Sequence, residues 1–466
     1  MPAAMPGRPR PASHRSASPR LASPRLASPR LARPGASSRR RWPAGVRGRA
    51  LSAFLLLALL PGCGVLTPSA GGSSARGPLQ VWIMEPGAPE LRAFFTSATA
   101  DFEAAHRGDR VEVQFVPWAS AHDQFVTAIG GGQVPDVAEM GSTWTPEFGD
   151  IGALEPADVA GPPGGPGRFV PSLVEGATVD GKVYGVPWYA GARALIYRAD
   201  VLAALGLSVP TTWPELVSVG RAIRDRTGKA AFGVAGNAEH YVLPMVWQNG
   251  GEIAYRTGGI WRSGMDSPAA VAAVQFYADL YRTEHFAPAG ALSWNARDVR
   301  KAFEAGDLAM MIGGAWDLRA LLAAHPELAG KVGTALLPAG PGGDRDSFAG
   351  GSHLVVFSGT KKEALARRYV DFLLDPGRVT AFTTKIGFLP GAKDALAAAT
   401  PADPLYRPFS AQLEDHSRTY PPTREWGGFE ADGLFTAAVQ QVMAGKKTAA
   451  QAMKAVAKTM DAAFSG

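Results

Sequence analysis

The chain of 466 residues has one cysteine, Cys63, and eight histidines that are scattered along it. A single cysteine excludes an internal disulfide framework and any zinc site made of several cysteines. The histidines lack the His-Glu-x-x-His spacing of a zinc-binding helix, so the sequence shows no metal site, and we expect no cofactor. A phosphate-binding glycine-rich loop and a Gly-x-Ser-x-Gly nucleophile turn are also missing, so no enzyme motif stands out.

Acidic residues are missing from the first part of the chain. Residues 1–62 hold twelve arginines but no lysine, aspartate or glutamate, whereas the remainder holds 35 basic and 41 acidic side chains. The net charge of +6 therefore combines a leader of +12 with a remainder of −6. Nucleic-acid binding needs basic residues among exposed aromatic ones in the folded part, so this acidic remainder argues against a nucleic-acid partner.

The leader also has little apolar surface to bury. Pentapeptide repeats fill residues 17–31, and their regularly spaced prolines prevent helix propagation while the like charges repel, so we predict disorder. An apolar run of eleven residues follows at 50–60. This run is too short to span a bilayer, but its length is typical of the apolar core of a signal peptide.

The segment around Cys63 resembles a bacterial lipoprotein signal, because a small residue and this lone cysteine come directly after the apolar run. The resemblance implies that Cys63 carries a diacylglyceryl group that tethers the protein to the outer face of the cell membrane. Residues 63–77 would then form a flexible Gly/Ser-rich tether. An ordinary signal peptide with an incidental cysteine is the alternative, and for the leader either a translation start at Val46 or a twin-arginine signal at 38–42 stays open.

Strand and helix patterns alternate after the tether. We predict strands at 78–84, 111–116 and 136–140, separated by helices at 89–106 and 122–129. This order indicates parallel βαβ units, and ligands of such sheets bind beyond the carboxyl ends of the strands. Further helices are expected at 199–205, 213–226, 268–284, 296–305, 361–374 and, interrupted at Gly445, 432–464.

Four segments together carry a family resemblance. They are Asp-Gly-Lys-Val-Tyr-Gly-Val-Pro at 180–187 with Ala-Leu-Ile-Tyr-Arg at 194–198, Ala-Phe-Glu-Ala-Gly-Asp-Leu-Ala-Met at 302–310 leading into Gly-Ala-Trp at 314–316, Gly-Gly-Ser-His-Leu-Val-Val at 350–356, and Gly-Phe-Leu-Pro at 387–390. In this order, over roughly residues 78–430, the chain resembles the extracellular solute-binding proteins of carbohydrate ABC importers, the maltose- and chitobiose-binding type.

The resemblance implies an α/β, two-lobed periplasmic-binding-protein fold with a ligand cleft between the lobes. Crossover hinge strands would lie near 189–192, 349–351 and 414–418. Lobe one would comprise 78–191 with 350–415, and lobe two 192–349 with 416–466. The expected function is to capture a di- or oligosaccharide as a monomer, without turning it over, and to deliver it to the membrane permease of the importer.

A sugar presents apolar C–H faces and hydroxyl edges, so its site needs flat aromatic platforms and a ring of polar groups. The resemblance implies that Trp316 stacks on the sugar and that Trp426 lies where relatives carry another platform. Trp144 follows a predicted strand, where a ligand loop is expected. Trp247 and Trp294 are candidates that could equally belong to the core. We assign the following residues to packing or to the surface: Trp82, Trp118, Trp213 and Trp261.

Polar candidates lie mostly at the expected crossovers. Glu85 follows the first strand, where relatives place a hydroxyl-binding group. Many relatives carry an acid at the position of Gly191, which departs from that pattern. Arg193 could supply hydrogen bonds to the sugar instead, or pair structurally with an acid. The remaining cleft candidates are Trp188 and Tyr189 at the first crossover, Gly350, Gly351 and Ser352 at the return crossover, and Glu239 and Asn249.

Two other functions stay open at this point. A polyol or glycerol phosphate would require a cluster of Arg or Lys in the cleft, and only Arg193 and Arg424 stand out as candidates. A secreted glycoside-acting enzyme would require two carboxylates across the scissile bond, and no motif singles out such a pair.

Overall fold

The computed structural model describes residues 76–465, except 86–88, 161–164, 166 and 400–402, and it describes only the backbone of residues 89 and 90. The described residues belong to one compact unit. The predicted leader, signal peptide and Cys63 lie outside this part of the chain, as does nearly all of the tether. Lipidation of Cys63 therefore stays a prediction.

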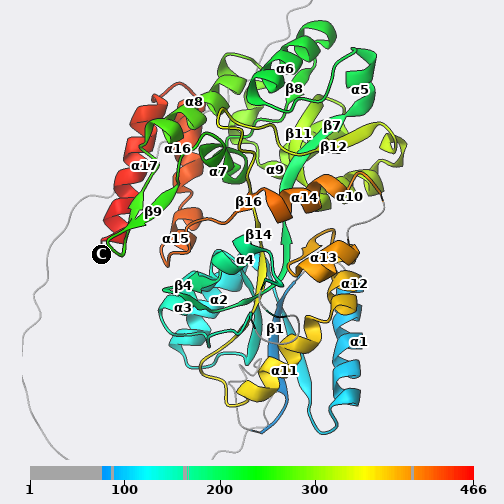
Figure 1. Ribbon diagram of the computed structural model, residues 1–466, viewed down its shortest axis with the longest axis vertical. Helices are drawn as coiled ribbons and strands as arrows, with labels where there is room; N and C mark the ends of the chain where they lie inside the picture. The colour runs from blue at the N-terminus through cyan, green and yellow to red at the C-terminus, as the bar shows by residue number, and fades with distance from the viewer. Residues whose placement is uncertain (1–75, 86–88, 161–164, 166, 400–402, 466) are drawn as a thin grey trace, which may run out of the picture. The chain divides into compact units, whose positions relative to one another are not determined.

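The first lobe is built on a six-stranded sheet (Figure 1). Strand β1 (Leu79–Met84) is parallel to β2 (Val111–Val116) and to β3 (Val137–Gly141), as expected for βαβ units. Strand β14 (Gly350–Val356) is antiparallel both to β3 and to β6 (Val186–Gly191). Segments that are far apart in the sequence therefore meet in this sheet.

Helices cover both faces of this sheet. Alternate residues of β1 separate the two layers, because Val81 and Ile83 join one hydrophobic cluster whereas Trp82 packs against the other. The first cluster takes in α1 (Pro89–Ala105), α11 (Glu363–Leu373) and α12 (Pro376–Ile386), and the second takes in α2 (Trp118–Gly130) and α3 (Thr145–Asp150).

The second lobe is built on a four-stranded sheet. Strand β7 (Arg193–Arg198) is antiparallel to β11 (Leu308–Gly314) and to β12 (Val332–Ala335), and β8 (Ala230–Phe232) is parallel to β11. One hydrophobic cluster joins this sheet to the surrounding helices. They are α5 (Ala199–Ala204), α6 (Trp213–Thr227), α7 (Glu239–Gln248), α8 (Pro268–Arg282), α9 (Ala296–Glu304), α10 (Ala315–Ala324), α15 (Trp426–Ala431), α16 (Leu434–Met443) and α17 (Ala449–Phe464).

The chain changes sheets at three places. Strand β6 ends at Gly191 in the first sheet, and β7 begins at Arg193 in the second. The chain returns through β13 (Ser347–Phe348) into β14, and it leaves again through β16 (Ser417–Arg418), which is parallel to β13. This arrangement agrees with the two-lobed α/β fold expected from the sequence.

The hydrophobic cluster around the second sheet reaches beyond the range expected for lobe two. It includes Phe409 and Leu413 of helix α14 (Arg407–Asp415), which falls in the range expected for lobe one, together with Leu173 and Leu396. Gln412 also accepts a hydrogen bond from the Leu337 backbone N–H (3.0 Å). The sequence pattern of a helix shows that it has an apolar face but does not show which lobe covers that face.

The remaining elements are short. They are α4 (Pro171–Glu175), the hairpin of β4 (Thr178–Val179) and β5 (Lys182–Val183), the hairpin of β9 (Ala254–Thr257) and β10 (Ile260–Ser263), β15 (Leu389–Pro390) at the edge of the first sheet, α13 (Lys393–Ala399), and 3-10 turns at Ala289–Ser293 and Pro326–Leu328. No helix in the described part of the chain combines the length and the apolar character needed to cross a membrane.

A buried ion pair ties the start of β3 to the segment before α11. The Asp136 side chain is fully buried, and its carboxylate accepts hydrogen bonds from the Lys362 ammonium (3.1 Å), the Gln80 backbone N–H (2.8 Å) and the Thr360 hydroxyl (2.5 Å). The Lys362 ammonium also donates to the Pro78 carbonyl (2.8 Å). Removal of this carboxylate would leave a buried ammonium without its counter-charge.

Asp136→Ala should therefore lower the free energy of unfolding by about 3–5 kcal/mol, the usual cost of breaking a buried pair from one side. Urea unfolding measures the change. The control is Asp101→Ala, because the exposed Asp101 carboxylate lies 4.0 Å from Arg378 and such a surface pair contributes about 0–1 kcal/mol. Equal losses in the two variants would contradict the prediction.

Candidate functional site

A cleft of about 740 Å³ lies between the two lobes. The carboxyl ends of the parallel strands β1 and β3 open into it, which is where ligands of such sheets bind. Strand β7, α7, α10 and α15 of lobe two line the opposite side. Nine of the residues predicted from the sequence line this cleft: Glu85, Trp144, Tyr189, Arg193, Glu239, Trp316, Gly350, Gly351 and Ser352.

Two tryptophan rings form one wall of the cleft. Trp144 directly precedes α3, and Trp118 begins α2; their ring centroids are 5.5 Å apart. Gly141 permits this arrangement, because a Cβ there would lie 3.3–3.4 Å from both indoles. Trp118 was expected in packing or at the surface but instead lines the cleft with 39% of its surface exposed. Glu85, beside this wall, pairs with Arg92.

The buried carboxylate of Glu139, in the middle of β3, forms the floor of the cleft. One carboxylate oxygen accepts hydrogen bonds from the hydroxyls of Tyr189 and Ser352 (2.7 Å for Ser352), and the other accepts from the Met84 backbone N–H (3.0 Å). A single side chain therefore joins four strands. Burial raises the pKa of Glu139 to about 7, although these hydrogen bonds act in the opposite direction.

The return crossover is held by the same network. The Ser352 hydroxyl donates to Glu139, and the Gly351 N–H donates to the Ser142 hydroxyl (3.2 Å). We expected these donors to face a ligand, whereas they already have partners within the protein. Ser352 and Gly351 therefore shape the floor of the cleft through these bonds.

Polar groups of lobe two gather on the opposite side. Potential metal-ligand atoms of Glu239, His240 and Glu430 lie within 4.8 Å of one another, and in the described part of the chain nothing further points to a metal there. Burial raises the pKa of Glu430 to about 7, and the charge of Glu239 adds to the shift. Burial lowers the pKa of His240 well below its usual range, and the charge of Arg193 adds to that shift.

Trp316 lies in the first turn of α10, with its ring stacked on Phe388 at a centroid distance of 4.7 Å. The guanidinium carbon of Arg193 lies 5.3 Å from the Trp316 ring centroid. A Cβ on Gly191 would lie 2.1 Å from an indole carbon of Trp316. The indole therefore fills the space that a side chain at position 191 would need.

Three predicted tryptophans are buried in the protein core and do not line the cleft. Trp188 is 1% exposed and stacks on Phe382 at 4.7 Å, within the helix layer of lobe one. Trp426 is also buried, and its ring centroid lies 4.5 Å from that of Tyr420, on which it stacks. The ring of Trp247 is buried as well and is covered by the Arg418 guanidinium. Their apolar rings are already covered by protein, so none offers a free platform.

Three other candidates also lie outside the cleft lining. Trp294 packs against the lobe-two core, and the Asn249 side chain donates to the Ala269 carbonyl (2.8 Å) at the end of α7. Arg424 pairs with Glu425 (2.8 Å) at a separate pocket. These side chains serve local packing and pairing.

Sequence patterns missed several cleft residues. Glu139 could have been noticed as an acid inside an otherwise buried strand, since such residues are rare without a partner. Phe388 lies in the Gly-Phe-Leu-Pro segment that carried the resemblance, yet no role was expected for it. His240, Glu430 and Lys385 also line the cleft, and no local sequence signal marked them.

Comparison with known proteins agrees with this architecture. A model of the family described as bacterial extracellular solute-binding protein matches residues 88–378. A protein of Brucella abortus is 28% identical over 360 residues, which cover 76% of this chain and 82% of that protein. The diacetylchitobiose binding protein of Streptomyces coelicolor is 28% identical over 372 residues, with the same shares covered.

Solved structures confirm the predicted two-lobed α/β fold. An ABC transporter solute-binding protein of Thermotoga lettingae, bound with α-D-tagatose, is 27% identical with a TM-score of 0.69, covering 84% of this chain and all of that one. The sugar-binding protein MalE of Xanthomonas citri is 26% identical with a TM-score of 0.72, covering 84% of this chain and 98% of that one.

The raised pKa of Glu139 predicts a pH-dependent stability. Since the folded-state pKa of about 7 lies above the ordinary 4.5, the folded protein keeps a proton that the unfolded chain has lost, and stability falls as pH rises through this window. The Glu139→Gln side chain cannot ionise. The difference in the free energy of unfolding between this variant and the natural protein should therefore shift in favour of the variant by on the order of 3 kcal/mol between pH 5 and pH 8.

Urea unfolding at pH 5, 6, 7 and 8 measures this difference. Glu112→Gln, at an exposed position on β2, is the matched control for a change from carboxylate to amide. A difference between Glu139→Gln and the natural protein that stays constant with pH would show that Glu139 does not hold its proton in the folded state.

Proposed function

The chain belongs to the bacterial extracellular solute-binding proteins, and from this premise we propose that its solute is a di- or oligosaccharide. The observation that carries the proposal is a cleft lined by indole rings and carboxylates, with Trp118 and Trp144 on one wall and Glu239 and Glu430 on another. Aromatic rings suit the apolar faces of sugars, and carboxylates accept hydrogen bonds from hydroxyls. The bound sugar then passes to a membrane permease of an ABC importer.

A phosphorylated solute fits this cleft less well. Phosphate recognition favours a cluster of Arg or Lys. Arg193 and Lys385 line the cleft together with four glutamates, and Arg424 lies at another pocket. The low pKa of His240 keeps its ring neutral at ordinary pH, so it adds no cation. The charge of the cleft therefore favours a neutral sugar.

We also infer that the protein binds its sugar without cleaving it. The diacetylchitobiose binding protein and the two solved structures named above are binding proteins. A glycosidase holds its two carboxylates on either side of the scissile bond. The cleft is lined by four glutamates, of which Glu239 and Glu430 are neighbours within lobe two. On the lobe-one side, Glu139 is hydrogen-bonded to Tyr189 and Ser352, and Glu85 pairs with Arg92, so these two carboxylates are already engaged within the protein.

The sugar assignment predicts ligand-induced stabilisation without turnover. The melting temperature should rise with at least one sugar of a panel of maltose, maltotetraose, diacetylchitobiose, arabinooligosaccharides and tagatose, because a ligand that binds only the folded state stabilises it. Chromatography after incubation should recover the sugar unchanged. A panel without any shift contradicts the sugar assignment, and hydrolysis products contradict the non-enzymatic one.

Trp316→Ala should weaken the binding of the sugar found in this panel by about 1–3 kcal/mol, the usual contribution of a buried aromatic contact. Isothermal titration calorimetry measures the change. Trp294→Ala is the control, since this half-buried indole lies outside the cleft lining. Equal losses of affinity would show that the effect is not specific to the cleft.

The membrane tether is proposed from the sequence around Cys63. The thiol of Cys63 is the group that would receive the lipid. The Cys63→Ser variant should therefore carry no lipid and should move from the membrane fraction to the soluble fraction of cells. Metabolic labelling with a radioactive fatty acid, followed by fractionation, measures both effects. Labelling that persists in Cys63→Ser would contradict this proposal.

A further inference from the structure

Two glycines seat the indole of Trp316. A Cβ on Gly314 would lie 2.3–2.4 Å from three consecutive carbons of the six-membered ring, so the Gly314 backbone lies over one face of this ring. A Cβ on Gly191 would lie 2.1 Å from Cζ3 but 2.9 and 3.1 Å from the adjacent carbons, so Gly191 borders the ring edge. One face of the indole is therefore closed by the protein backbone.

The opposite face of the indole is closed by Phe388. The two rings are nearly parallel, at 13°, with centroids 4.7 Å apart. Gly314 already occupies one side, so Phe388 must cover the other. Trp316 belongs to α10 of lobe two, whereas Phe388 lies between α12 and β15 of lobe one, so this stack also joins the two lobes.

We propose that Phe388 is a gate over Trp316, which a sugar ring displaces when it stacks on the indole. This inference rests on the proposed sugar-binding function and adds a residue that controls it. Phe388 presents a flat apolar ring at the distance at which rings stack, so it competes with the apolar face of a sugar for the same surface.

The gate opens by rotation of the Phe388 side chain, which also releases its edge contact with the Tyr189 ring (5.2 Å between centroids). The backbone at 388 is held, because its N–H donates to the Thr383 carbonyl (3.1 Å) and Leu389 continues into β15. The preceding Gly387 has a φ of +75° and approaches α10 closely: a Cβ there would lie 3.0 Å from the Trp316 Cα. The half-buried Phe388 ring lines the cleft, into which it can swing.

The first experiment tests the cover itself, without any sugar. Acrylamide quenching of tryptophan fluorescence is measured for the natural protein, Trp316→Phe, Phe388→Ala and Phe388→Ala/Trp316→Phe. The difference between the natural protein and Trp316→Phe isolates the signal of Trp316 with Phe388 present. The difference between Phe388→Ala and the double variant isolates it with Phe388 removed. Removal of Phe388 should raise the quenching constant of Trp316 at least twofold, because its outer face becomes accessible. An unchanged constant overturns the gate.

The second experiment measures affinity for the sugar that the panel identifies. Phe388→Ala should bind it about 3- to 10-fold more tightly, the range expected from the loss of one competing ring stack. Weaker binding would mean that Phe388 contacts the sugar as a platform, and unchanged binding would mean that the indole is not the sugar's surface; either result overturns the gate. If the natural protein binds no sugar of the panel, the proposed function fails, and the gate fails with it.

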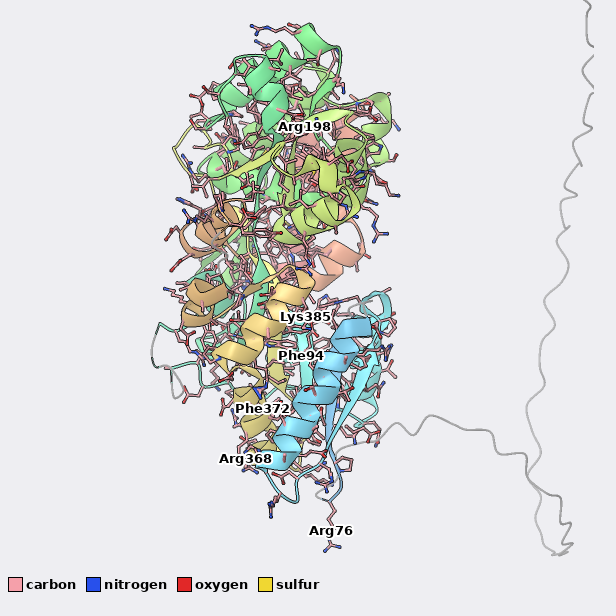
Figure 2. The ribbon with its side chains drawn as sticks, turned by 90° about the vertical axis from the view of Figure 1, so that its right-hand side faces the viewer. Arg76, Phe94, Arg198, Arg368, Phe372 and Lys385 are labelled. Atoms are coloured by element: carbon pink, nitrogen blue, oxygen red, sulfur yellow. The ribbon has the colours of Figure 1, made fainter. Side chains whose placement is uncertain are left out.

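A control separates the gate from a general loss of aromatic packing. Phe94, labelled in Figure 2, is a half-buried residue of α1 that does not line the cleft. Its ring centroid lies 5.1 Å from that of Phe382. Phe94→Ala should leave the affinity and the quenching of Trp316 unchanged. An increase in affinity equal to that of Phe388→Ala would assign the effect to looser packing of lobe one and overturn the gate. Thermal unfolding of each variant confirms that it is folded.

Discussion

The cleft depends on one buried carboxylate. A charged or polar group inside a sheet is tolerated only when it finds hydrogen-bond partners, and Glu139 finds them on three neighbouring strands. Two of these donors, Tyr189 and Ser352, lie directly beside the crossovers between the lobes. The floor of the site and the connections about which the lobes would move relative to one another are therefore parts of one hydrogen-bond network.

Glycines, which have no side chain, shape the aromatic part of the site. Gly141 admits the two indoles of the lobe-one wall, and Gly191 and Gly314 admit the indole of Trp316. At each position a Cβ would lie in or close to the space that the ring occupies. The expectation of an acid at position 191, which came from the family resemblance, thus meets a steric obstacle, since the same space cannot hold both an acidic side chain and this indole.

Much of the fold was predictable from local sequence. Strand β2 has the predicted bounds 111–116, and helices α1, α6 and α9 differ from their predicted ends by one residue. Periodic apolar patterns and capping residues act within a few neighbours, so they can be read without tertiary structure. Helix α2 begins at Trp118, four residues before the predicted start, although Trp118 and Ala121 continue the apolar spacing of Phe125 and Ala128 toward the N-terminus.

The sequence by itself determined the α/β class, the family resemblance and nine residues that line the cleft. Tertiary structure alone decided which tryptophans are accessible: Trp426 and Trp188 are covered by other rings, whereas Trp118 is open. It also decided that Glu139 lies under the cleft and that Phe388 covers Trp316. The physical reason is that burial and stacking depend on partners far away in the chain, which no local pattern specifies.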